Sequence, residues 1–440
     1  MKKYIYALLI LLILSYAVSA GAANRYVRAG ATGSNNGADW TNAFTSLPST
    51  LIRSDTYYIA DGTYGFYKFD DAENGTQVIT IKKATATDHG TNTGWNSSYG
   101  DGIAQFGGFE FNRGYYVIDG QQRTSWTSGY GLKIQGTMAN QKLVNFLGKP
   151  AASHVTIKYV ELEHRGRYKA TSDDIFYAQY SGASSRPEHI TIQYCYIHNC
   201  SRCHFLWRNV GYWTIEYCFI SENDSTAAVH GQAISDGDSD YIVLRYNIWR
   251  NIDGTGAWTT MYGDAYNWDI YGNIVYYTDD FDGGSYATLR VLYDASNWGR
   301  AYNWKIYNNT FVNTKGSHVG FTIDAGSGNV AYNNMFYNCP PALFWGITPK
   351  YSAYFNTTVY QGDDASTRQT GEGDPFVNSA NYDFHLSSAT QKGKSDLGSP
   401  YNITMDGILR DQDDCWDRGA YEYNPDYTIA PPHNLRLSAY

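Results

Sequence analysis

The chain of 440 residues has few charged side chains. Asp, Glu, Lys and Arg together make up 17% of it, against about 25% in an average soluble protein. Only 33 residues are Lys or Arg and the net charge is −9, which excludes a broad nucleic-acid-binding surface, because such a surface is basic. The 43 Gly residues follow no collagen period, which excludes a triple helix. Beyond the N-terminus, no segment is apolar enough to span a bilayer.

Hydrophobic and aromatic residues are plentiful. Hydrophobic residues make up 43% of the chain, enough to build a core, so wholesale disorder is excluded. The chain has 42 Tyr, 18 Phe and 12 Trp. Many Tyr, Asn, Gly and Thr residues with few charges are typical of an exported all-β protein.

The N-terminus has the layout of an export signal. Lys2 and Lys3 precede an apolar run over residues 4–18, and small residues suited to cleavage follow at 18–23. We therefore predict a signal peptide at 1–23, with an uncleaved N-terminal anchor as the alternative. The mature protein is expected to be secreted, periplasmic or at the cell surface, free of the membrane and in a compartment that permits disulfides.

Eight short segments repeat one pattern at intervals of 22 to 36 residues. Their central positions are Ile157, Ile192, Ile215, Leu244, Ile270, Ile306, Ala331 and Ala353. Apolar residues alternate with polar ones around these positions, which predicts strands with one buried face. Two positions beyond the bend a second apolar column predicts a second strand: Leu162, Ile197, Ile220, Trp249, Val275, Phe311 and Phe336.

A polar column marks the bend between these two strands. Three positions after each centre stand Val160, Cys195, Cys218, Asn247, Asn273, Asn309, Asn334 and Asn356. We expect the five Asn side chains to hydrogen-bond one another in a ladder, and Asn also suits a left-handed bend. The adjoining column predicts a tyrosine ladder: Tyr159, Tyr194, Tyr217 and Tyr246.

Repeats of short strands bent at stacked Asn residues predict an all-β, single-stranded parallel β-helix. A propeller blade would be longer and contain hairpins, and helical repeats would show a period of 3.6. The pattern resembles right-handed parallel β-helix proteins of the pectate-lyase-like superfamily, of the secreted bacterial type, over most of residues 25–423. Residues 26–40 and 55–64 resemble the cap and first rung of such proteins, and residues 374–377, 383–386 and 417–423 resemble their closing motif.

Three regions are therefore expected: a signal peptide at 1–23, the β-helix with its cap and closing motif at 24–423, and a tail or linker stub at 424–440. The resemblance implies binding or processing of an extracellular polysaccharide along a lateral groove. Its motifs recur in proteins of many functions, so they specify the architecture and leave the activity open. Neither nucleic acid nor membrane is expected as a partner, and the oligomeric state is not predicted.

Acids, imidazoles and guanidiniums recur at similar places in adjacent repeats. Since neighbouring rungs lie about 4.8 Å apart, these side chains would form one surface patch suited to uronate lyase or glycoside hydrolase chemistry. The alternative is ordinary decoration of a solvated face. The candidate catalytic residues are Asp173, Asp174, His204, His230, Arg208 and Arg290, and the candidates for stacking on sugar rings are Trp207, Tyr262 and Tyr293.

A short acidic stretch suggests a calcium site. Asp236, Asp238 and Asp240 have the alternating spacing of a calcium loop, although the Gly and the late Glu of that motif are missing. The alternative is turn chemistry, in which an Asp side chain bonds its own backbone.

The six cysteines leave several possibilities open. Cys195 and Cys218 hold equivalent positions on neighbouring rungs and are either a disulfide or buried free thiols. Cys200, Cys203 and His204 have the C-x-x-C-H form of a c-type haem attachment site, with a Cys200–Cys203 or neighbouring disulfide as the alternative. Three functions thus compete: a polysaccharide lyase or hydrolase, a non-catalytic glycan-binding or adhesive surface protein, and an exported haem protein.

Overall fold

A computed structural model describes residues 21–147, 152–166, 171–179, 186–223, 231–252, 258–260, 263–281, 299–316, 318–323, 326–410 and 416–427. The predicted signal peptide and the predicted tail lie mostly outside these residues. Within them, no helix is long and apolar enough to cross a membrane. The only helical pieces described are two 3₁₀ turns, η1 (Ser97–Tyr99) and η2 (Ser379–Asn381).

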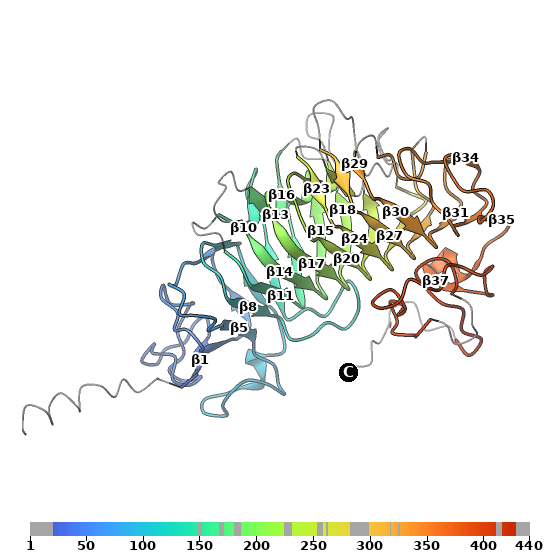
Figure 1. The fold of residues 1–440 in the computed structure, drawn as a ribbon. Helices are drawn as coiled ribbons and strands as arrows, with labels where there is room; N and C mark the ends of the chain where they lie inside the picture. Colours follow the sequence, from blue (N-terminus) through green and yellow to red (C-terminus); the bar gives the residue numbers. More distant parts are fainter. Residues whose placement is uncertain are drawn as a thin grey trace, which may run out of the picture.

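Two long parallel sheets run along the molecule and a third, shorter one accompanies them over the earlier rungs, so that successive strands mostly fall in successive sheets (Figure 1). Sheet A contains, in order, β1 (Asn24–Val27), β2 (Thr56–Ile59), β5 (Ile79–Lys83), β8 (Tyr116–Asp119), β11 (Val155–Lys158), β14 (Glu188–Gln193), β17 (Gly211–Glu216), β20 (Val243–Arg245), β24 (Asp269–Tyr271), β27 (Lys305–Tyr307) and β30 (Val330–Tyr332). Sheet B contains β3 (Gly62–Thr63), β6 (Ala104–Phe106), β9 (Leu132–Gln135), β12 (Val160–Glu163), β15 (Tyr196–Cys200), β18 (Phe219–Asn223), β21 (Ile248–Ile252), β25 (Ile274–Tyr276), β28 (Thr310–Val312), β31 (Met335–Tyr337), β33 (Ala353–Phe355) and β35 (Gln369–Gly371).

Sheet C completes each rung and is shorter. It contains β4 (Tyr67–Phe69), β7 (Phe109–Phe111), β10 (Lys142–Phe146), β13 (Asp174–Gln179), β16 (Cys203–Arg208), β19 (Gln232–Asp236) and β22 (Trp258–Thr260). Smaller parallel pairings join β23 (Ala265–Tyr266), β26 (Ala301–Tyr302) and β29 (Gly326–Ser327), and join β32 (Ala342–Leu343) to β34 (Val359–Gln361). The predicted right-handed parallel β-helix is therefore confirmed, with a third strand per rung that the repeat pattern did not reveal.

The core is a stack of side chains from equivalent positions of successive rungs. In sheet A the register pairs Ile157 with Ile192 and Ile192 with Ile215, so each apolar column points inward as predicted. The indole rings of Trp268 and Trp304 lie parallel with centroids 4.3 Å apart. All five of these side chains are fully buried, so the hydrophobic effect holds the rungs in register.

The bend between sheets A and B is left-handed at each rung. Tyr159, Tyr194, Tyr217 and Tyr246 have φ values between 51° and 56°, a region that bulky residues rarely adopt. Neighbouring rings in this column lie 4.9 to 5.2 Å apart. We infer that ring stacking and burial offset the backbone cost of the bend.

Four of the five predicted Asn residues form a hydrogen-bonded column. The Nδ2 groups of Asn247, Asn273 and Asn309 each donate to the Oδ1 of the next Asn at 3.0–3.1 Å, ending at Asn334. The prediction was wrong for Asn356, because Ala353 pairs with Met335 in sheet B and therefore does not continue sheet A. Asn356 is exposed and accepts a hydrogen bond from the Gly373 N–H.

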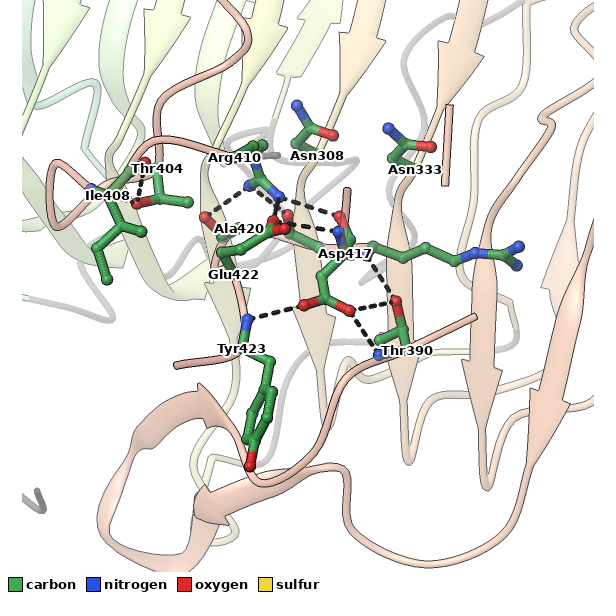
Figure 2. Close-up of polar contacts among 12 residues, drawn as sticks. Asn308, Asn333, Thr390, Thr404, Ile408, Arg410, Asp417, Ala420, Glu422 and Tyr423 are labelled. Atoms are coloured by element: carbon green, nitrogen blue, oxygen red, sulfur yellow. Dashed lines mark hydrogen bonds and ion pairs between the residues drawn. The ribbon is translucent and has the colours of Figure 1, made fainter. Parts of the chain in front are cut away.

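The C-terminal segment lies against the outside of the solenoid. It carries the antiparallel pair β36 (Phe376–Asn378) and β37 (Asp383–Leu386). Arg410 fixes its end (Figure 2): the buried guanidinium donates to Glu422 Oε2 at 3.0 Å and to the carbonyl oxygens of Asp417, Gly419 and Ala420. We call Arg410 and the partners of its guanidinium group the clasp: Asp417, Gly419, Ala420 and Glu422. These four partners belong to the predicted closing motif, and the clasp lies on the side of the rungs.

Candidate functional site

Charged side chains gather where sheet B turns into sheet C in three consecutive rungs. These turns follow β9, β12 and β15 and lead into β10, β13 and β16. We call the residues at the turns the turn cluster: Lys142, His164, Arg165, Asp173, Asp174 and Arg202. On the outer face of sheet B beside it lies what we call the sheet B quartet: Lys133, Glu161, Glu163 and His198.

Asp173 is the first carboxylate of the turn cluster. It is fully buried and accepts hydrogen bonds from Arg165 Nη2 at 2.9 Å, Thr171 Oγ1 at 2.9 Å and the Asn140 N–H at 2.7 Å. Burial raises the pKa of Asp173, but the hydrogen bonds from Arg165, Thr171 and Asn140, together with the nearby His164, outweigh burial and hold the pKa below its usual range. Asp173 therefore stays ionised at neutral pH.

Asp174 is the second, also fully buried. Arg202 donates a hydrogen bond from Nε to Oδ1 at 2.7 Å and another from Nη2 to Oδ2. Lys142 Nζ also donates to Oδ2. Bidentate guanidinium–carboxylate pairs are strong and well oriented. Since two cations share one carboxylate, this spot carries an excess of one positive charge.

His164 is neutral in this arrangement. Its Nδ1 accepts the Arg165 N–H at 2.8 Å, so the proton is on Nε2, which donates to the Gln141 carbonyl oxygen at 3.2 Å. Burial lowers the pKa of His164. Its Nδ1 lies 3.6 Å from Asp173, a distance that is not an ion pair while the ring is neutral.

The sheet B quartet surrounds an ammonium group. Lys133 Nζ lies 2.8 Å from Glu161 Oε1 and 2.5 Å from Glu163 Oε2, and His198 Nε2 lies 3.2 Å from Glu161 Oε1. Burial raises the pKa values of Glu161 and Glu163, but the hydrogen bonds of Lys133, His198 and Asn199 outweigh it and lower both. Both carboxylates therefore stay ionised.

The quartet also has the one set of three close ligand groups found among the described residues. The ligand atoms of Glu161, Glu163 and His198 lie within 4.8 Å of one another, and carboxylate oxygens suit Ca²⁺. The Lys133 ammonium group already pairs with both carboxylates and neutralises one of their two charges, so a metal ion would have to displace it. The donor set therefore fits an internal cation better than an added metal.

The residues predicted to bind calcium are not brought together. Asp236 is fully buried and accepts from Ser239 Oγ at 2.8 Å, and Asp238 Oδ1 accepts the Asp264 N–H. Asp240 accepts from Asn267 Nδ2 and lies 3.6 Å from Arg186. Each carboxylate thus faces a different partner, Asp236 within its own turn and the other two on residues distant in the sequence.

The haem interpretation fails a test of fit. Cys200, Cys203 and His204 are all buried, and the His204 Nε2 that would hold iron donates to the Ser221 carbonyl oxygen at 2.8 Å. Burial lowers the pKa of His204 to about 3, so it is a neutral core histidine and takes no part in proton transfer at neutral pH. The prediction of His204 as a catalytic residue is therefore wrong as well.

The described cysteines are free thiols. Cys195, Cys200, Cys203, Cys218 and Cys339 are all buried and unbridged, and burial raises the pKa of Cys200 and Cys218 well above the usual value. They act as small core residues. The disulfide alternatives for Cys195–Cys218 and Cys200–Cys203 are thus wrong, and Cys415 lies outside the described residues.

The remaining predicted residues divide into two groups. Trp207 is 1% exposed and packs edge-on against Trp213 in the core, so its ring is closed to a sugar and that prediction is wrong. Arg208 is half-buried at the end of β16, paired in register with Gln179. The other four candidates lie outside the described residues: His230, Arg290, Tyr262 and Tyr293.

Sequence reasoning missed the sheet B quartet. Glu161 and Glu163 flank the inward-pointing Leu162, so their alternation in V-E-L-E placed both on the outer face. The alternation therefore predicts the outward position of both Glu residues, but only its apolar positions were used to define the repeat. Lys133 lies on β9, a strand outside the eight segments that defined the repeat.

No protein-family model and no curated protein matches this chain. Solved structures similar to it include a variant of the PL6-family alginate lyase AlyGC, with 14% identity over 77% of this chain and a TM-score of 0.36. This chain spans about half (53%) of that lyase. A mannuronic-acid-specific family 6 lyase from human gut microbiota has 12% identity over 73% of this chain and 78% of its own, with a TM-score of 0.32.

A PL6-family polysaccharide lyase from Pseudopedobacter saltans has 13% identity over 73% of this chain and 88% of its own, with a TM-score of 0.29. At such identities a likeness concerns the fold. The strand pairing described above establishes that fold independently.

Proposed function

We propose that this protein is exported and that it binds and cleaves an anionic extracellular polysaccharide at the turn cluster. The observation that carries the proposal is the gathering of Lys142, Arg165 and Arg202 around two buried carboxylates on three consecutive rungs. In a chain with a net charge of −9, such a concentration of cations is the natural place for a uronate carboxylate to bind.

Elimination suits the cluster better than hydrolysis. A hydrolase needs one carboxyl group that stays protonated to donate to the leaving oxygen, whereas the lowered pKa values of Glu161, Glu163 and Asp173 keep these groups ionised. In elimination, a base removes the proton next to a carboxylate that cations neutralise. A carbon–carbon double bond forms, the glycosidic carbon–oxygen bond breaks, and the leaving oxygen takes a proton.

His198 is the candidate base. Glu161 holds its Nε2 at 3.2 Å, and the ring stacks on Tyr196 with centroids 3.8 Å apart, so the imidazole is fixed in orientation. The residue is buried, at 5% exposed, and within the described part of the chain no hydrogen bond reaches its Nδ1, so this nitrogen holds the lone pair that would take the substrate's proton. A carboxylate that orients an imidazole is a recurring arrangement for proton abstraction.

Glycan binding without cleavage is the second candidate. It is favoured by the close pairing of Asp173, Asp174, Glu161 and Glu163 with cations, which is typical of a structural network. In this case the turn cluster binds the glycan chain, and no side chain acts as a base.

The test is to incubate the protein with a panel of polyuronates and follow unsaturated products by ultraviolet absorbance, with reducing ends and glycan binding measured in parallel. We expect Arg202→Gln to reduce binding and product formation at least tenfold, while Arg250→Gln leaves both unchanged. Arg250 is a matched control outside the turn cluster, since it is similarly exposed and pairs with Glu222 at 3.0 Å on the outer face of sheet B, two rungs beyond His198. Binding without product would support the second candidate. The absence of both binding and products in every assay would contradict both candidates.

A further inference from the structure

We propose that Phe66 is a sugar-stacking subsite that extends the turn cluster along the solenoid axis; this inference rests on the proposed function. Phe66 directly precedes β4 and its side chain is 54% exposed. The register pairs Tyr67 with Phe109 and Phe109 with Val144, so Phe66, Gly108 and Leu143 follow one another on successive rungs. The ligand would be one ring of an anionic glycan chain.

Two glycines let Phe66 pack closely on the backbone of the next rung. Gly107 and Gly108 form the turn of the next rung and contribute no side chain. A Cβ at Gly108 would lie 3.1 Å from Phe66 Cδ2 and 3.1 Å from Gln141 Nε2, and its φ of +147° is one that only glycine adopts readily. The phenyl ring and the Gln141 amide therefore flank the bare backbone, an apolar surface beside a polar group, as sugar sites require.

Gln141 connects this ring to the turn cluster. Its Nε2 donates to the Gly107 carbonyl oxygen at 2.7 Å, and its own carbonyl oxygen accepts the Asp174 N–H at 3.3 Å. The preceding residue, Asn140, donates its N–H to Asp173 Oδ1 at 2.7 Å. Residues 140–142 thus form a continuous surface from Phe66 to both carboxylates.

Distance and charge together select a chain-like anionic ligand. From β4 to β13 there are three rung steps of about 4.8 Å each, or about 14 Å in all, so a single sugar cannot touch both ends. At the far end Lys142 and Arg202, each 23% exposed, leave one positive charge in excess over Asp174. An oligosaccharide would therefore place a carboxylate there while an uncharged ring face stacks on Phe66.

A single exposed phenylalanine is common on protein surfaces, so the test needs a matched control. Trp345 is 56% exposed at the opposite end of the solenoid. Binding of short and long oligouronides is measured for the wild type, Phe66→Ala, Trp345→Ala and Arg202→Gln, together with each thermal midpoint.

We expect Phe66→Ala to weaken binding of long oligouronides at least fivefold and binding of disaccharides less than twofold, with an unchanged thermal midpoint. Trp345→Ala should match the wild type. If the wild type binds and Arg202→Gln weakens binding, but Phe66→Ala does not, the subsite is overturned and the proposed function stands. If the wild type binds no polyuronate, both are overturned. Equal loss in Phe66→Ala and Trp345→Ala would show that surface aromatics act non-specifically, which also overturns the subsite.

Discussion

The outer face of sheet B is open over its first half and covered over its second. On β9 and β12 the outward side chains are charged or polar and half-buried, and on β15 Tyr196 is half-buried and His198 is buried, with the quartet at their centre. From β25 to β33 they are apolar and packed under the C-terminal segment, where Tyr276 contacts Phe384 and Tyr337 contacts Phe376.

The same strand geometry therefore serves two purposes. A parallel sheet with two apolar faces must be covered on both, and the C-terminal segment supplies that cover for the later rungs. The earlier rungs have a polar outer face that needs no cover, and the charged side chains gather there. The proposed function therefore assigns recognition to the open half, while the covered half contributes stability.

The two halves also differ in the column of buried residues at the bend between sheets A and B. Under the covered half the bend column consists of Asn247, Asn273, Asn309 and Asn334, each bonded to the next. Under the open half the same column contains Val160, Cys195 and Cys218, and Cys218 meets the end of the Asn series through its N–H on Asn247 Oδ1. Within this column, side-chain hydrogen bonds from Asn to Asn thus occur in the half that the C-terminal segment covers.

The largest effect is expected from breaking the clasp. Arg410→Met leaves Glu422 buried without its cation and removes the donors to three carbonyl oxygens. We expect the free energy of unfolding to fall by about 3–5 kcal/mol, measured by chemical denaturation. The surface control Lys350→Met, a weak 3.8 Å pair with Asp364, should change it by less than about 1 kcal/mol. Equal effects would contradict the role of the clasp.

An intermediate effect should separate the two kinds of bend column. Asn309→Ala leaves the N–H and the amide of Asn273 without their acceptor, and each buried orphan donor costs about 1–3 kcal/mol. Cys195→Ala removes only a small apolar group, at a cost of about 1 kcal/mol. Chemical denaturation of both variants checks the ranking, and the exposed Asn356→Ala should be neutral. A larger loss of unfolding free energy for Cys195→Ala than for Asn309→Ala would show that the Asn column does not stabilise the bend more than the apolar column does.

Sheets A and B were predictable because their inward positions are apolar and their outward positions polar over consecutive residues. Sheet C was not, because strands such as β16 are buried almost throughout and show no alternation. The same lack of alternation explains the errors at Trp207 and His204, whose orientation a fully buried strand does not reveal. Asp173 and Asp174 could be singled out because the next rungs carry His204 and His230 at comparable places, whereas the cations that pair with them come from turns whose contacts no spacing rule specifies.

The smallest effect concerns pH, which should act on the two halves in opposite directions. In the covered half, His385 lies between Asp383 and Asp406 and between the rings of Tyr421 and Tyr427, each 3.9 Å away. Burial lowers its pKa, but the hydrogen bond to Asp383 and the Asp406 charge outweigh burial and raise the pKa above its usual 6.5. Its contribution is therefore complete below about pH 6.5 and is lost as pH rises through the raised value.

In the open half, Glu161, Glu163 and Asp173 have lowered pKa values. Their contribution is complete above the unfolded-state values of about 4 and is lost as pH falls through the lowered ones. Thermal midpoints measured from pH 3 to 9 should therefore fall on both sides. His385→Gln should flatten the alkaline side, with a smaller change on the acid side because His385 also lowers the pKa values of Asp383 and Asp406. Glu161→Gln should reduce the acid side alone. If His385→Gln changed the acid side equally, the two halves would not titrate as separate structures, and the division between a clasped half and a recognition half would lose its electrostatic basis.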